Sequence, residues 1–119
     1  YIESIFSPLN TISKNRSKNL TSKNIRKNFY YTKTKKFNDL IEAKFDFLNI
    51  DLEGVDFEVL KTINLNFYKP KLICIEVLEK KNFLKIKKYL IKFGYHFIKV
   101  LEPSHFFELR TKKNLKGPQ

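Results

Sequence analysis

The chain has 119 residues, of which 42% are hydrophobic, and this is the size and composition of one ordinary folded domain. It contains no run of about 18 apolar residues, so a membrane-spanning helix is excluded; its lone Cys74 excludes an internal disulfide and is compatible with a reducing, cytoplasmic location. Its net charge of +12 comes mainly from lysines, whereas phosphate and base recognition favours arginine, so we do not expect nucleic acid as the primary partner.

The first part of the chain carries few signals of regular structure. Residues 11–28 are rich in Ser, Thr, Asn and Lys and predict a polar loop. Aromatic and Thr residues over 29–34 favour a short strand. The apolar spacing over 37–43 predicts a short amphipathic helix.

The middle of the chain alternates between apolar strands and an amphipathic helix. Residues 45–50 predict a short strand, and Gly54 marks the turn that follows it. The next helix is predicted from four apolar residues at helical spacing, namely Val55, Val59, Leu60 and Ile63. After the stop signal of Pro70, the nearly continuous apolar run 72–78 is typical of a strand that is buried on both faces.

The last part of the chain predicts one more helix and two strands. The helix is recognised from an apolar stripe of Phe83, Ile86, Leu90 and Phe93. Gly94 is placed to end this helix, and residues 95–101 predict the strand after it. A turn at 102–104 leads into a final strand at 105–110, and we expect the tail 111–119 to fray.

This order of elements predicts an α/β fold. Alternation of strands and helices indicates consecutive βαβ units, whose strands are parallel and whose crossovers are right-handed. The last two strands are joined by too few residues for a crossover, so they must pair antiparallel. We therefore expect a sheet of parallel strands with helices that ends in a C-terminal antiparallel hairpin.

Carboxylates gather where the predicted strands end. Residues 45–79 hold seven of the twelve acidic side chains and only three basic ones. Asp51 and Glu53 follow one predicted strand, and they could either belong to a site or cap the next helix. Glu76 ends an otherwise apolar strand, where a carboxylate needs a cavity or a structural ion pair.

The other residues with reactive side chains fit structural roles. Asp56 and Glu58 fall in the first turn of a helix, where they complement its dipole and favour solubility. His96 lies within a strand, and His105 could reach the site but is better explained as a structural residue. Cys74 is expected to pack in the core as a small hydrophobic residue.

Several segments together resemble one enzyme family. Residues 46–61 (DFLNIDLEGVDFEVLK) resemble the signature of FkbM-family methyltransferases, in which an apolar strand leads into I-D-x-E-G and an amphipathic helix. Residues 69–77 (KPKLICIEV) are similar to the family's next strand, and 93–97 (FGYHF) to its later Gly-Tyr step. Residues 34–41 (TKKFNDLI) resemble the step before the signature, so the resemblance covers roughly residues 30–101.

The resemblance implies S-adenosylmethionine-dependent methyl transfer, commonly to a hydroxyl of a saccharide or small metabolite. It also implies a partial Rossmann-like sheet of a class I methyltransferase, in which ligands bind beyond the carboxyl ends of the strands. Asp51, Glu53 and Glu76 are then the candidate catalytic residues. Asp51 is the best candidate to orient or deprotonate the acceptor, with help from Glu53. The Asp51 and Glu53 pair could also hold Mg²⁺ or Ca²⁺, but the family does not require a metal and none is predicted.

The cofactor side of such an enzyme is missing from the sequence. Class I methyltransferases hold S-adenosylmethionine with a glycine-rich loop, whereas this chain has only Gly54, Gly94 and Gly117 and no G-x-G. The resemblance therefore implies that residues 1–110 are the C-terminal portion of a methyltransferase domain, inactive alone and without an assigned cofactor-binding residue. The exposed edge of such an unfinished sheet is a site where the chain could associate with another chain or aggregate.

One alternative follows from charge instead of from the resemblance. The Lys-rich segments 11–36 and 80–92 could make the chain a non-catalytic module that binds RNA or other polyanions. Such binding would weaken steeply as salt is added.

Overall fold

The computed structural model describes residue 31 and residues 33–111. Its elements in chain order are α2 (Phe37–Leu40), β1 (Phe47–Ile50), α3 (Asp56–Thr62), α4 (Leu65–Tyr68), β2 (Leu72–Glu76), α5 (Lys80–Ile91), β3 (Tyr95–Leu101) and β4 (Ser104–Leu109). The predicted loop 11–28 and all but the first residue of the predicted tail lie outside the described residues.

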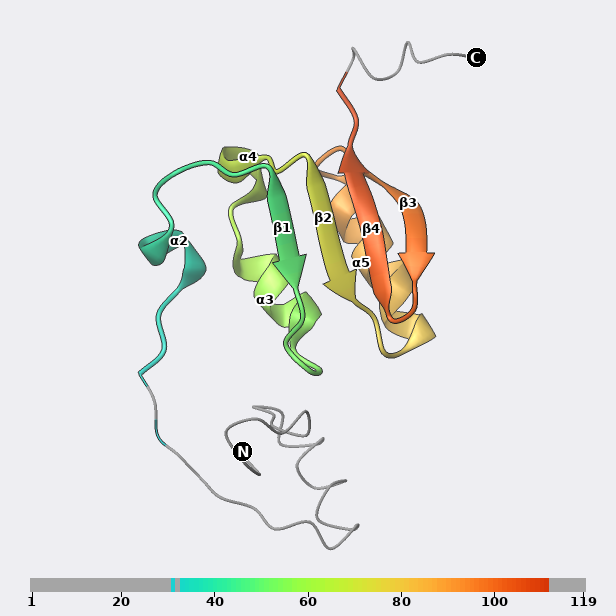
Figure 1. Cartoon of the computed structure of the whole chain (residues 1–119), viewed down its shortest axis with the longest axis horizontal. Coiled ribbons are helices and arrows are strands. Elements are labelled where there is room, and N and C mark those ends of the chain that lie inside the picture. The colour runs from blue at the N-terminus through green and yellow to red at the C-terminus, as the bar shows by residue number, and fades with distance from the viewer. Residues whose placement is uncertain (1–30, 32, 112–119) are drawn as a thin grey trace, which may run out of the picture.

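The four strands form one mixed sheet in the order β1-β2-β4-β3 (Figure 1). β1 and β2 are parallel, whereas β4 is antiparallel to both β2 and β3. The α/β class and the C-terminal antiparallel hairpin are therefore confirmed. The hairpin folds so that β4 lies between β2 and β3, because α5 carries the chain one strand position past β2 and leaves a gap that β4 fills.

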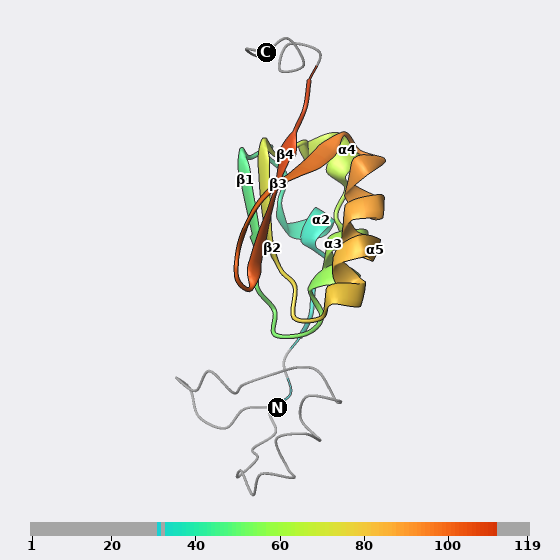
Figure 2. The same ribbon diagram turned by 90° about the vertical axis from the view of Figure 1, so that its right-hand side faces the viewer.

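The helices α3 and α5 lie on the same side of the sheet, and no described helix covers the opposite side (Figure 2). The core forms between that covered face and the helices. Ile73 and Ile75 of β2 and Phe107 of β4 are fully buried there, against Leu60 of α3 and Leu90 of α5. Burying each such side chain contributes about 1.5–3 kcal/mol, so this layer fixes the strands on which the site is built.

The two elements predicted at the N-terminal side of the described chain differ from the structure. The predicted strand 29–34 is wrong for its described residues, because residues 31, 33 and 34 pair with no strand in the part of the chain that the structure describes, and Tyr31 is fully exposed. The predicted helix 37–43 is reduced to the single turn of α2. It ends at Ile41, whose extended backbone lets its carbonyl accept a hydrogen bond from the Tyr68 hydroxyl.

The helix predicted after Gly54 is confirmed as α3, and a second short helix that we did not predict, α4, follows it. α3 ends at Thr62, and α4 begins three residues later, at Leu65, with Asn64 as its cap. There the side chain of Asn64 accepts a hydrogen bond of 3.2 Å from the backbone N–H of Phe67. Such a cap satisfies a donor that the first turn leaves free, which stabilises even a four-residue helix.

The C-terminal half agrees more closely with the prediction. β3 has the predicted bounds, and Gly94 takes a left-handed φ of 88° just before it, as expected of a residue after a helix. β2 stops at Glu76 because the N–H of Val77 leaves the sheet and donates to the carbonyl of Pro103 at 2.9 Å. Among the described helices, none is long and apolar enough to cross a membrane.

Candidate functional site

The three predicted site residues lie together at one edge of the sheet. Asp51 and Glu53 follow β1 and Glu76 ends β2, and the parallel pairing of these strands brings their carboxyl ends to the same edge (Figure 1). One carboxylate oxygen from each residue lies within 4.8 Å of the other two. The structure thus gathers the three side chains, and their catalytic role stays a prediction.

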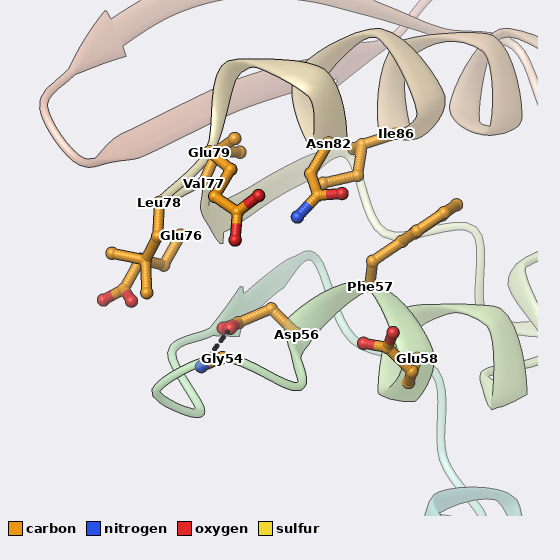
Figure 3. A pocket seen from close by; sticks show the side chains of 10 residues that line it. All are labelled: Gly54, Asp56, Phe57, Glu58, Glu76, Val77, Leu78, Glu79, Asn82 and Ile86. Atoms are coloured by element: carbon orange, nitrogen blue, oxygen red, sulfur yellow. Dashed lines mark hydrogen bonds between the residues drawn. The ribbon is translucent and has the colours of Figure 1, made fainter. Parts of the chain in front are cut away.

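The loop between β1 and α3 is held in shape by Asp56. Its carboxylate accepts hydrogen bonds from the backbone N–H of Leu52 at 2.8 Å and of Gly54 at 3.2 Å, the second of which is drawn in Figure 3. Glu53 has a φ of 55°, a left-handed conformation that costs a non-glycine residue about 1 kcal/mol. The two hydrogen bonds offset this cost and fix where the Glu53 side chain begins.

Two sequence-based interpretations of this loop are corrected by the structure. Asp56 is only 5% exposed, so its predicted solubility role is wrong, because both of its carboxylate oxygens bind backbone N–H groups inside the loop. Helix α3 begins after Val55 without any side-chain cap. Asp51 and Glu53 therefore do not cap that helix.

Glu76 is the most unusual carboxylate of the site. It is 9% exposed, and its Oε1 atom is buried without a hydrogen-bond partner among the described residues. Burial raises the pKa of Glu76 to about 7, helped by a side-chain hydrogen bond with Asp51 and by the negative charges of Asp51, Glu53 and Asp56. Two carboxyl groups share a hydrogen bond only if one is protonated. Glu76 therefore keeps its proton up to about neutral pH.

A structural ion pair does not explain Glu76. In the part of the chain that the structure describes, the ion pairs join Lys71 to Asp46 and Lys81 to Glu79, and both are exposed at the surface. No basic side chain there neutralises Glu76. Of the two alternatives that the sequence leaves for this residue, the cavity is the one that the geometry favours.

A pocket of about 100 Å³ opens beside Glu76, between the first turn of α3 and the start of α5 (Figure 3). Phe57 and Ile86 give it an apolar lining, while Asp56 of α3 and Asn82 of α5 face it from opposite sides. Sequence reasoning missed Asn82, since a lone amide in a lysine-rich helical turn carries no distinguishing signal. The lining of carboxylates and one amide suits a ligand with hydroxyl groups or a cation.

The remaining candidates are structural. His105 is 8% exposed, its Nδ1 lies 3.1 Å from the Pro103 carbonyl, and its ring packs 5.0 Å from that of Phe83. Cys74 is buried as predicted, and burial raises the pKa of its thiol. His96 is half-buried within β3. None of the three lines the pocket beside Glu76.

Comparison with known families agrees with this geometry. The family model of the methyltransferase FkbM domain matches residues 2–97, which is most of the chain and includes all three carboxylates. The chain belongs to the FkbM methyltransferase family. No curated protein and no solved structure matches it. The match places the carboxylate edge within the FkbM domain and gives no support to the alternative of a polyanion-binding module.

Proposed function

We propose that this FkbM domain takes part in S-adenosylmethionine-dependent O-methylation of a saccharide or small-metabolite hydroxyl. The observation that carries the proposal is the position of the Asp51 and Glu76 carboxyl groups, which lie close together at the carboxyl ends of two parallel strands. In open α/β sheets, ligands bind beyond these ends. The mixed sheet with its antiparallel last strand is compatible with a Rossmann-like class I methyltransferase.

The pair has the chemistry that the acceptor side of the reaction needs. A hydroxyl that takes a methyl group on its oxygen must lose its proton as the new bond forms. A base works best when its pKa lies near the operating pH, and the pKa of Glu76, about 7, meets that condition. We assign proton removal to the Asp51–Glu76 pair and orientation of the hydroxyl to Asp51 and Glu53.

The described residues do not fit the methyl donor by themselves. Their two glycines, Gly54 and Gly94, lie in separate turns, and neither belongs to a glycine-rich loop. We therefore assign no donor-binding residue and no step to the donor. We expect the groups that hold it to lie outside residues 31 and 33–111, and the 119-residue chain alone to be inactive.

The proposal is tested by measuring S-adenosylhomocysteine formation. The assay compares the 119-residue chain with the longest natural polypeptide that contains it, against a panel of monosaccharides and small hydroxylated metabolites. We expect turnover only with the longer polypeptide, and calorimetry should show that it binds S-adenosylmethionine. If it forms no S-adenosylhomocysteine with any acceptor and does not bind the donor, the proposal is wrong.

Variants of the longer polypeptide test the site itself. Asp51→Asn should lower kcat by about 10²–10⁴-fold, the range that general acid–base catalysis contributes. Glu108→Gln is the matched control, because it also removes one negative charge but lies on β4 opposite Leu72, at the far end of β2 from Glu76. Unchanged turnover in Asp51→Asn would remove this residue from the reaction.

A further inference from the structure

Glu76 carries a buried polar atom that nothing described in the structure satisfies. The residue is only 9% exposed, and its Oε1 atom has no hydrogen-bond partner among the described residues. In native proteins such atoms are rare, and a bound water, ion or ligand is the usual explanation. The atom belongs to a carboxylate that other carboxylates surround, and this negative charge favours a positively charged ligand.

The spacing of the surrounding oxygens fits one metal ion. Asp51, Glu53 and Glu76 each offer one carboxylate oxygen, and the three atoms lie within 4.8 Å of one another. Oxygens on opposite sides of a Ca²⁺ ion are about 4.6–5.2 Å apart, and about 4.0–4.2 Å apart across Mg²⁺, given their usual bond lengths. The three oxygens can therefore enter one Ca²⁺ shell with little movement, whereas the tighter Mg²⁺ shell requires them to move closer wherever two of them lie more than about 4.2 Å apart.

We propose that Asp51, Glu53 and Glu76 together bind one hard divalent cation, Ca²⁺ or Mg²⁺, at the carboxyl ends of β1 and β2. This site goes beyond the proposed function, and it differs from the expectation from sequence, which placed no metal here. Three carboxylates carry enough charge to neutralise the ion, and carboxylate oxygens are the ligands that both ions prefer. The ion in turn gives the buried Glu76 carboxylate a positively charged partner, which it lacks among the described residues.

Asp56 is the residue that holds the site in shape without binding the ion. One of its carboxylate oxygens accepts the N–H of Leu52 and the other accepts the N–H of Gly54, so both are already engaged. These bonds fix the backbone on either side of Glu53. Loop residues that are fixed before binding lose less freedom when the ion enters.

The ion also has a place in the chemistry, and this step alone rests on the proposed function. Both ions take six or more oxygen ligands, so positions remain open after three carboxylates have bound. An acceptor hydroxyl in an open position loses its proton more readily, because the cation stabilises the oxygen anion. The ion would make the hydroxyl more acidic, and the proton would pass to a carboxylate oxygen of the Asp51–Glu76 pair that does not bind the ion.

The site is tested by calorimetric titration of the chelator-treated 119-residue chain, with CaCl₂ in one series and MgCl₂ in the other. We expect saturable binding of one ion per chain, and the two series show which ion is preferred. Asp51→Asn and Glu76→Gln should each weaken metal binding at least tenfold. Removing even a residue that only hydrogen-bonds to a metal ligand typically lowers metal affinity 10–100-fold. Glu108→Gln, with the same change in charge at the far end of the sheet, should bind like the parent chain.

A second measurement keeps the test independent of folding defects. Far-UV circular dichroism confirms that each variant is folded, and the preferred ion should raise the thermal midpoint of the parent chain and of Glu108→Gln but not of Glu76→Gln. Absence of saturable binding of both ions up to about 10 mM would overturn the site, since even weak protein sites bind Ca²⁺ near 1 mM. Equal weakening in Glu108→Gln, or equal protection by methylammonium chloride, would also overturn it.

No methyl donor or acceptor enters these measurements. A failed titration therefore counts against the metal site and leaves the proposed methyl transfer standing. Conversely, if the chain binds the ion but the longer polypeptide shows no methyltransferase activity, only the proposed function is refuted.

Discussion

Replacing Glu76 with glutamine should stabilise the metal-free chain at neutral pH. The pKa of Glu76 is raised from 4.5 to about 7 in the folded state, chiefly by burial. A group whose pKa is raised by folding contributes stability below its unfolded pKa, and this contribution is lost as pH rises through the folded pKa. Each pKa unit is worth about 1.4 kcal/mol, so ionising Glu76 costs the folded chain up to about 3 kcal/mol above pH 7.

Glutamine has nearly the same shape but no charge to bury. Its amide can also donate a hydrogen bond to Asp51, which keeps the contact that the protonated carboxyl makes. The free energy of unfolding of Glu76→Gln should therefore match that of the parent chain below pH 4.5. It should exceed the parent value by a growing amount between pH 4.5 and pH 7, up to the limit of about 3 kcal/mol.

Urea unfolding followed by circular dichroism, repeated from pH 4 to pH 8 with EDTA present, measures this difference. Glu108 is exposed, so Glu108→Gln should change stability by less than about 0.5 kcal/mol at every pH. A difference for Glu76→Gln that does not vary with pH would refute the reasoning. So would a glutamine variant that is less stable than the parent at pH 7.

Three further predictions concern the framework around the site. Tyr95→Phe should lower the free energy of unfolding by about 1–2 kcal/mol in urea unfolding, because the buried carbonyl of Pro70 loses the hydroxyl that donates to it at 2.8 Å. Gly94→Ala should destabilise by about 1–2 kcal/mol in the same assay, since φ is +88° and the new Cβ would lie 3.3 Å from Leu109 Cδ1. Cys74 should react with a thiol reagent many times more slowly in the folded chain than in urea, because burial hides the thiol and raises its pKa.

The elements predicted best are those whose signal is local and long. α5 shows its apolar stripe over twelve residues, and β2 shows an uninterrupted apolar run, so each was recognised from its own segment. The gathering of Asp51, Glu53 and Glu76 was predictable for a related reason. Parallel strands that follow each other in sequence end at the same edge, so residues that follow those ends meet there.

The elements that sequence analysis missed depend on contacts between distant segments. α2 is short because the Tyr68 hydroxyl binds the carbonyl of Ile41, and residues so far apart in sequence give no local sign of that bond. The position of β4 between β2 and β3 is likewise not determined by the chain order, which allows more than one order of these strands in the sheet. Asp56 was misjudged because its partners are backbone N–H groups of a tight loop, which no residue pattern reveals.

The proposed catalytic role of Glu76 and its proposed role as a metal ligand both depend on its buried, unsatisfied carboxylate. A purely structural role for Glu76 makes different predictions. A carboxylate retained only for folding would have a donor for each buried oxygen, and glutamine in its place would weaken the fold. Glu76 instead has an unsatisfied oxygen next to other carboxylates, so ionising it opposes folding. Proteins keep such unfavourable groups where function needs them. If Glu76→Gln is more stable than the parent chain without metal and also unable to bind the ion, then the Glu76 carboxylate lowers the stability of the fold and is required for metal binding.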